Sequence, residues 1–222
     1  MRNMNQFNQE IGIPLEYWQQ ANMPNGKILE GKYCLLEPLN KNEHAQKLFE
    51  ILHHNSGESW TYLPYGPFQN VQEFECWINK SLAEKDCFFY TIRDKKINQP
   101  VGICAYLRIN QEHGVIEIGH LNFSHLLQKK PAATEAMYLM MKQAFDLGYR
   151  RYEWKCHSMN QPSRRAAERL GFQFEGIFRQ HLVVKKHNRD TAWFSIMDHE
   201  WPLLKNKFER WLDPVNFDAA GM

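Results

Sequence analysis

Residues 127–172 limit the possible folds of this chain more than any other stretch of its sequence. They predict a loop, a long helix, a short strand and a second helix, in that order. The long helix follows a loop at residues 128–133 and carries small and apolar residues at the spacing of one buried stripe. The residues of this stripe are Ala133, Ala136, Met137, Met140, Ala144 and Leu147. Gly148 is suited to the position after the helix, where a left-handed backbone costs glycine little.

A short strand and a second helix are predicted after the long helix. Large or apolar residues at positions 152, 154 and 156 alternate with polar residues at 153, 155 and 157, which is the period of a strand. Asn160 is suited to cap the second helix, Pro162 is tolerated in its first turn, and Gly171 is suited to its end. The loop before the long helix has the form of an anion-binding turn, because the first N–H groups of a helix and its dipole attract phosphate. The arrangement suits a cofactor with a pyrophosphate and a long arm.

These residues resemble the GNAT superfamily of N-acetyltransferases, which use acetyl-coenzyme A. The loop pattern of that family is Q/R-x-x-G-x-G/A, and Gln128 and Ala133 occupy its first and last positions. Further along, the chain resembles the subgroup that includes ribosomal-protein N-terminal acetyltransferases (RimJ/RimL-like). The segments that carry this likeness are Asn160-x-x-Ser163 and Leu170-Gly171-Phe172-x-x-Glu175-Gly176-x-x-Arg179. The resemblance is strong over residues 115–196 and compatible from residue 32 onward.

The resemblance implies acetyl-CoA as cosubstrate and a set of residues that bind it. Pro131 departs from the family pattern, which usually has glycine there, and removes one amide donor from the loop. Lys129 and Lys130 would offset that loss as point charges on the pyrophosphate. The implied cofactor-binding residues are Leu121, Phe123, Gln128, Lys129, Lys130, Ala132, Ala133, Thr134, Asn160 and Ser163. No metal site is predicted.

The rest of the chain predicts consecutive strands first and strand–helix alternation later. Strands are predicted at residues 32–39, 88–93, 100–109, 115–123, 172–184 and 191–196, and further helices at 41–53, 71–83 and 202–212. Residues 185–190 are predicted to form a polar turn. Strands joined by short turns usually pair antiparallel. The predicted fold class is therefore α+β, with a mixed, mostly antiparallel central sheet flanked by helices, as the resemblance also implies.

We expect three parts in the chain: an N-terminal extension (1–26), a GNAT-like acetyltransferase domain (27–198) and a C-terminal helical tail (199–222). The extension is either docked through scattered apolar residues or a flexible tail. These apolar residues are Ile11, Ile13, Leu15, Tyr17 and Trp18. The tail helix either packs on the domain through Leu204, Phe208 and Trp211 or forms the contact of a homodimer.

Acetyl transfer to an amine needs a base, donors for the oxyanion and a proton for the departing thiolate. The candidate bases are Glu117, His120 and His181, and each is alternatively a structural residue. Backbone N–H groups near the end of the 115–123 strand are candidate oxyanion donors. Ser163 is the candidate proton donor, because Phe172 stands where many family members have a tyrosine. The alternative for Ser163 is a hydroxyl that bonds the backbone of its own helix.

The acceptor amine is left open by the sequence. Four aromatic residues in the loop at 59–68 either line an acceptor pocket or cover the core. The acceptor is either a small amine, such as a polyamine, or the α-amine of a protein. The alternative to an enzyme is a non-catalytic acyl-CoA sensor, which would bind the cofactor but lack a working base and acid.

Composition narrows the class of protein further. A chain of 222 residues with 43% apolar residues suits one sizeable domain with extensions. A formal net charge of +2 argues against nucleic-acid binding. Five cysteines without CxxC spacing argue against disulfides and favour a cytoplasmic location. A polar N-terminal segment and the lack of a long apolar run predict no membrane association.

Overall fold

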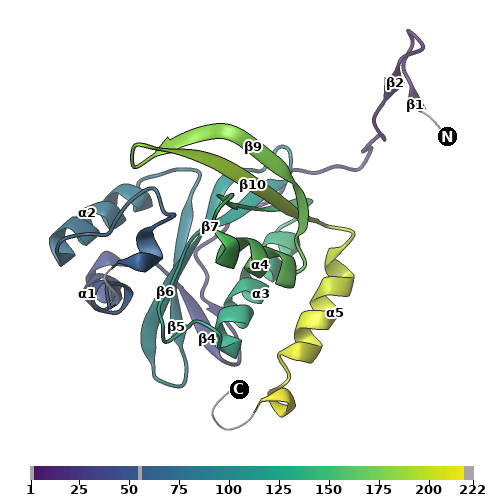
Figure 1. Ribbon diagram of the computed structural model, residues 1–222. Coiled ribbons are helices and arrows are strands. Elements are labelled where there is room, and N and C mark those ends of the chain that lie inside the picture. The colour runs from purple at the N-terminus through teal and green to yellow at the C-terminus, as the bar shows by residue number, and fades with distance from the viewer. Residues whose placement is uncertain (1–2, 55–56, 218–222) are drawn as a thin grey trace.

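The computed structural model describes residues 3–54 and 57–217 and is built on an eight-stranded sheet (Figure 1). The strands, in the order in which they lie in the sheet, are β3 (Leu29–Glu30), β4 (Cys34–Pro38), β5 (Phe88–Asp94), β6 (Gln99–Asn110), β7 (Val115–Phe123), β8 (Arg151–His157), β10 (His187–Met197) and β9 (Gln173–Val184). Neighbouring strands are antiparallel except β7 and β8, which are parallel. The predicted mixed, mostly antiparallel sheet is confirmed.

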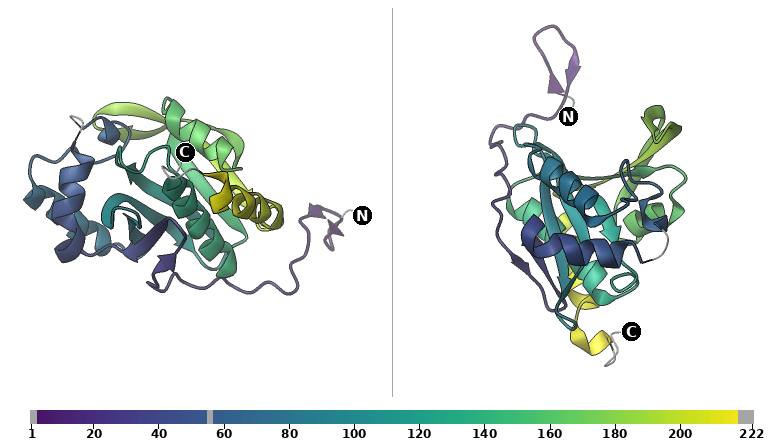
Figure 2. Two further views of the ribbon diagram at one scale, coloured as in Figure 1. Left: turned by 90° about the horizontal axis from the view of Figure 1, so that it is seen from below. Right: turned by 90° about the vertical axis from the view of Figure 1, so that its left-hand side faces the viewer.

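Helices cover both faces of the sheet. They are α1 (Lys41–Leu52), α2 (Val71–Leu82), α3 (Pro131–Asp146), α4 (Gln161–Arg169) and α5 (Trp201–Trp211), with short 3-10 helices η1 (Glu58–Trp60) and η2 (Pro214–Asn216). The first two α-helices lie on one face and the other three on the opposite face (Figures 1 and 2). Each layer has its own apolar core. No helix in the described ranges has the length and apolar character that crossing a membrane requires.

The parallel pair β7–β8 separates after four residue pairs, from Val115 with Arg151 to Ile118 with Trp154. Both strands continue past this point, β7 to Phe123 and β8 to His157. A β-bulge interrupts β7 here, because two residues, 120 and 121, lie opposite the single residue 104 of β6. A bulge bends its strand. The N–H and C=O groups of residues 119–123 that face β8 therefore have no partner strand within the described sheet.

The β9–β10 hairpin turns more tightly than predicted. β10 begins at His187, so the turn consists of Lys185 and Lys186 rather than residues 185–190. Their φ angles of 50° and 66° are both left-handed. This is the geometry of the two-residue turn that Asn-Gly pairs usually signal. A Lys-Lys pair carries no such signal, and the sequence prediction was wrong for this reason.

The N-terminal extension docks on the domain only through its later part. The indole Nε1 of Trp18 donates to the carbonyl of Glu112 at 2.9 Å, and Ala21 is buried. Ile11, Ile13, Leu15 and Tyr17 are at least half exposed, so the docking alternative holds for Trp18 and not for these four residues. The small hairpin of β1 (Asn3–Met4) and β2 (Glu10–Ile11), which contains Ile11, lies away from the sheet (Figure 2). Residues 1 and 2 of the predicted extension lie outside the described residues.

The C-terminal tail packs on the domain through α5. Trp201 and Phe208 are buried, and the Tyr138 hydroxyl on α3 donates to Glu209 at 2.9 Å. Trp211 is 44% exposed, and the homodimer contact stays a prediction. Residues 218–222 of the predicted tail lie outside the described residues.

A buried carboxylate joins α3 to the first strands of the sheet. Glu135 is 3% exposed and accepts backbone N–H bonds from Lys32, Tyr33 and Cys34 at 2.6, 2.7 and 2.9 Å. The fit is tight, since a Cβ at Gly31 would lie 2.3 Å from this carboxylate. A buried carboxylate is costly without donors, so these bonds specify how the start of α3 is seated against the sheet.

We predict that Glu135→Gln lowers the free energy of unfolding by about 2–4 kcal/mol. The NH2 group of glutamine is a donor, so it cannot accept the backbone N–H bonds that one carboxylate oxygen of Glu135 accepts. Urea unfolding followed by tryptophan fluorescence measures the change. Glu50→Gln, which alters an exposed carboxylate on α1, should change the free energy of unfolding far less than Glu135→Gln does. Equal losses in the two variants would contradict the role given to Glu135.

Candidate active site

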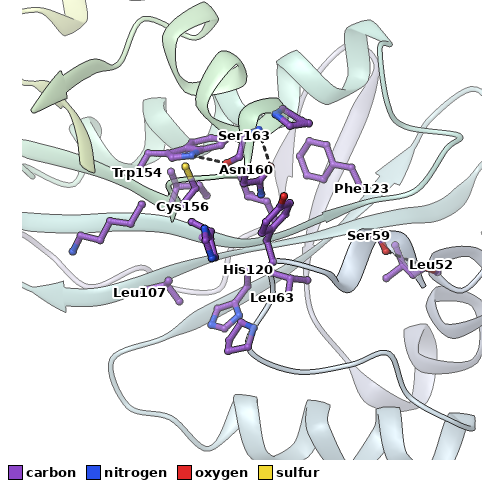
Figure 3. Close-up of a pocket in the computed structure, with 18 of the residues that line it drawn as sticks. Leu52, Ser59, Leu63, Leu107, His120, Phe123, Trp154, Cys156, Asn160 and Ser163 are labelled. Atoms are coloured by element: carbon purple, nitrogen blue, oxygen red, sulfur yellow. Dashed lines mark hydrogen bonds between the residues drawn. The ribbon is translucent and has the colours of Figure 1, made fainter. Parts of the chain in front are cut away.

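A cavity of about 640 Å³ opens where β7 and β8 separate (Figure 3). Its wall is formed by the ends of these strands, the start of α4, the segment after α1 and the β9–β10 hairpin. Two bonds join these segments around the cavity. Lys185 Nζ donates to the carbonyl of Trp60 at 2.8 Å, and the Tyr62 hydroxyl donates to the carbonyl of Met159 at 3.4 Å. The site is thus assembled from parts of the chain that are distant in sequence.

Half of the residues predicted to bind the cofactor line this cavity. They are Leu121, Phe123, Gln128, Asn160 and Ser163. The Asn160 side chain caps α4 by accepting from the N–H of Ser163 at 3.2 Å. The Ser163 hydroxyl accepts from the indole of Trp154 at 3.0 Å, and no bond from it to the helix backbone is present in the described structure. Burial raises the pKa of the Cys156 thiol, and the Ser163 hydroxyl opposes this increase.

The other predicted cofactor residues lie at the start of α3. They are Lys129, Lys130, Ala132, Ala133 and Thr134. Lys129 has a left-handed φ of 61°, and Lys130 occupies the cap position. Pro131 is the first helical residue, where an N–H would have no partner within the helix, so its ring does not weaken α3. Gln128 Nε2 donates to the carbonyl of Phe123 at 2.8 Å and ties this helix start to the end of β7.

His120 lies on the bulge of β7 and on the cavity wall. Its Nδ1 is 2.6 Å from the hydroxyl oxygen of Tyr65, and its ring stacks on that of Tyr65. The Phe89 ring, 4.8 Å away between centroids, packs against it as well. Burial lowers the pKa of His120 to about 4, and the nearby charge of Arg108 acts in the same direction. The imidazole is therefore neutral near pH 7.

Glu117 also reaches the cavity but is held by two cations. Its Oε2 accepts from Arg108 at 2.5 Å and lies 3.0 Å from Lys155 Nζ. Burial raises the pKa of Glu117, whereas Lys155 and Arg108 oppose that increase. Because both cations bind the same carboxylate oxygen, Glu117 is better placed to organise charge than to take a proton.

His181 is not brought to the cavity. It is exposed on β9, where Nδ1 lies 3.0 Å from the Thr191 hydroxyl and the ring is near those of Phe178 and Trp193. The structure thus brings Glu117, His120 and Ser163 to one cavity and leaves His181 on a neighbouring surface.

Part of the aromatic loop at 59–68 covers the core and part lines the cavity, and its use as an acceptor pocket stays a prediction. Trp60 is fully buried, and Phe68 packs against the core of the α1–α2 layer. Tyr62 and its neighbours Ser59, Leu63 and Pro64 line the cavity. Sequence reasoning missed Tyr65 as the partner of His120, since no spacing rule links positions 55 residues apart.

Comparison with known proteins identifies the family that the sequence resembles. Residues 34–173 match the family model described as an acetyltransferase (GNAT) domain. A GCN5-related N-acetyltransferase from Brucella melitensis has a crystal structure that superposes with a TM-score of 0.91 at 50% identity, covering 94% of this chain and 95% of that one. An uncharacterized N-acetyltransferase, p20, from Bacillus licheniformis is 30% identical over 145 residues, which are 63% of this chain and 80% of the relative.

The predicted subgroup has a structural counterpart too. A RimL ribosomal-protein α-N-acetyltransferase solved with coenzyme A superposes with a TM-score of 0.67 at 18% identity, covering 77% of this chain and 98% of that one. At this identity the likeness shows a common fold.

We predict that His120 makes stability depend on pH. Its pKa is lowered to about 4 in the folded state, so the unfolded chain binds more protons between about pH 6.5 and pH 4. The contribution of His120 to the free energy of unfolding should be fully present above about pH 6.5 and should be lost as the pH falls toward 4. Between about pH 7 and pH 4.5, His120→Gln should abolish about 2–3 kcal/mol of that decrease in the free energy of unfolding.

Urea unfolding at the two pH values measures this difference. His113→Gln, at an exposed histidine between β6 and β7, should retain the decrease of the unaltered protein. The account of His120 is wrong if both variants keep the same pH dependence.

Proposed function

Because the chain belongs to the acetyltransferase (GNAT) domain family, we propose that it transfers an acetyl group directly to the primary amine of an acceptor while both substrates are bound. The predicted family is confirmed, and with it the enzyme class and the cosubstrate: the protein is an acetyl-CoA-dependent N-acetyltransferase. The observation that most supports direct transfer is the cavity between the separated ends of β7 and β8, because its wall carries predicted cofactor residues and the candidate base together.

The residues around the cavity fit acetyl-CoA, whose thioester supplies the acetyl group. The backbone of residues 119–122 has no partner strand along one side of the gap, and the carbonyl of Phe123 accepts from Gln128. On the same wall, the buried Ser124 hydroxyl has no hydrogen-bond partner among the described residues. Lys129, Lys130 and the first N–H groups of α3 form a cationic end for the pyrophosphate. Asn160 and Ser163 face the gap from α4.

We assign the base to His120. The imidazole lies on the cavity wall and is neutral near pH 7, because burial lowers its pKa to about 4. A pKa this low makes it a weak base, so its position rather than its pKa supports the assignment. When Nδ1 donates to the Tyr65 oxygen, Nε2 keeps a lone pair that accepts the proton of the amine. The other two candidate bases are less suitable. Oε2 of Glu117 already binds Arg108 and Lys155, and His181 lies outside the cavity.

Ser163 is our candidate proton donor. It would give a proton to the departing sulfur as the new N–C bond forms and the C–S bond breaks. Its oxygen accepts from Trp154, and its hydroxyl proton, which interacts with the Cys156 sulfur in this structure, is the one we assign to the departing thiolate. N–H groups of the bulge at residues 119–121 are candidate donors to the carbonyl oxygen, because a bulge frees them from the ladder. Binding both reactants in this geometry lowers the barrier further.

A thiol-release assay with acetyl-CoA and a panel of amines tests the proposal. The panel contains free amino acids, short peptides with a free N-terminus and polyamines. We expect saturable thiol release with at least one member and a matching acetylated product by mass spectrometry. We further predict that Ser163→Ala lowers kcat by about 10- to 100-fold, since it removes the proposed acid.

Calorimetric titration separates catalysis from binding in the same preparations. Ser163→Ala should lower kcat by more than it raises the dissociation constant of acetyl-CoA, because Ser163 is proposed both to donate the proton and to face the cosubstrate. Ser158→Ala, in the turn before α4, is the matched control and should keep full kcat. Tight binding of acetyl-CoA without release of thiol on any amine would favour a non-catalytic sensor instead. An unchanged kcat in Ser163→Ala would remove Ser163 from the mechanism.

A further inference from the structure

A ladder of charged residues crosses the sheet and reaches the wall of the cavity at Arg108, Glu117 and Lys155. Arg108 on β6 and Lys155 on β8 both bind Glu117 on β7. Lys155 Nζ also lies 2.8 Å from Glu153, which is 2.6 Å from Arg151. Arg151 in turn binds Glu175 on β9 at 2.5 Å. The ladder therefore contains as many carboxylates as cations, and each cation in it has a carboxylate partner.

Arg189 lines the same cavity but is not part of this set of paired charges. It is partly buried on β10, and its Nε donates to the Thr191 hydroxyl at 3.3 Å. A guanidinium has four further N–H donors on Nη1 and Nη2. None of these donors has a protein partner, and no carboxylate pairs with Arg189, in the part of the chain that the structure describes. Thr191 cannot neutralise it, because a hydroxyl carries no charge.

Arg189 lies on the cavity wall within electrostatic range of Glu117, Arg108 and Cys156. Burial lowers the pKa of Arg189, Arg108 lowers it too, and Glu117 and Cys156 oppose the decrease. Glu117 already binds both Arg108 and Lys155. The other carboxylate on the wall, Glu58, is exposed and forms no ion pair with Arg189 among the described residues. A partly desolvated cation without a counter-ion is unfavourable, so an anion bound there would be stabilised.

We propose that the acceptor is an amine with an anionic group, a carboxylate or a phosphate, close to its nitrogen, and that Arg189 binds this group. The inference rests on the proposed acetyl transfer and names the class of acceptor for that site. A guanidinium binds either anion with two parallel N–H bonds, which would orient the amine as well as hold it. The same positive charge disfavours a protonated amine nearby and so favours the neutral form that attacks. By the same reasoning, polycationic amines are poor acceptors.

Three matched pairs of acceptors test the proposal and separate the possible sources of the anion. Glycine and glycinamide test the carboxylate of a free amino acid. Two tetrapeptide amides, with aspartate or asparagine as the second residue, test an acidic side chain next to a peptide N-terminus. Phosphoethanolamine and ethanolamine test a phosphate. For each pair, the ratio of kcat/KM for the anionic member to that for the neutral member is measured in the unaltered protein and in Arg189→Gln. Comparing this ratio between the two proteins cancels the intrinsic reactivity of each amine.

In at least one pair, Arg189→Gln should reduce this ratio by about 10- to 100-fold, the usual effect of losing a charge-assisted contact. Lys186→Gln removes an exposed cation from the turn of the same hairpin and should leave the ratio unchanged. The dissociation constant of acetyl-CoA, measured by calorimetry, should be the same in all three proteins to within about 3-fold, under about 1 kcal/mol.

Other outcomes would overturn the proposal. If the ratio in every pair is the same in Arg189→Gln as in the unaltered protein, Arg189 does not select the acceptor. If Arg189→Gln instead weakens acetyl-CoA binding by about 10-fold or more and leaves the ratios unchanged, its partner is the cosubstrate. If acetyl-CoA binds and a polyamine is acetylated but no anionic amine is, the acceptor class is wrong while the proposed function stands. If the protein does not bind acetyl-CoA at all, both the proposed function and the proposed acceptor class are wrong.

Discussion

The short parallel pairing of β7 with β8 is the constraint on which the rest of the site depends. After Ile118 and Trp154 the two strands separate, and the bulge at His120 and Leu121 bends β7 at the same point. A sheet that continued to pair here would use its N–H and C=O groups internally and leave no opening. Because it does not, the middle of the sheet carries both a cavity and a row of free backbone groups. The chemistry of the protein is built around this interruption of an otherwise continuous sheet.

Other parts of the structure hold this opening in a defined shape. Glu135 fixes α3 against the first strands, and Gln128 ties the start of that helix to the end of β7. On the opposite side, Lys185 bonds the tip of the β9–β10 hairpin to Trp60. The ladder of ion pairs that begins at Arg108 crosses the sheet, reaches the cavity wall at Glu117 and Lys155, and contains equal numbers of cations and carboxylates. The surplus charge of Arg189 therefore stands out, and it is the feature of the wall most suited to choosing between acceptors.

The local elements were predictable because their signals lie within a few residues of one another. Asn160 as a cap depends on short-range hydrogen bonding, and the start of α3 follows from the loop before it. The contacts that define the site were not predictable in this way. Tyr65 meets His120, and Lys185 meets Trp60, only through packing of distant segments. Three candidate bases looked equivalent in the sequence, and burial and ion pairing separate them only in the folded chain.

Hydrogen–deuterium exchange with and without acetyl-CoA tests the central claim most directly. If the free backbone groups of β7 receive the cosubstrate, amides at residues 119–123 and at the start of α3 should exchange more slowly in its presence. Amides of α2, on the other layer, should exchange at the same rate in both conditions. Unchanged exchange at residues 119–123, in protein that binds acetyl-CoA, would contradict the account.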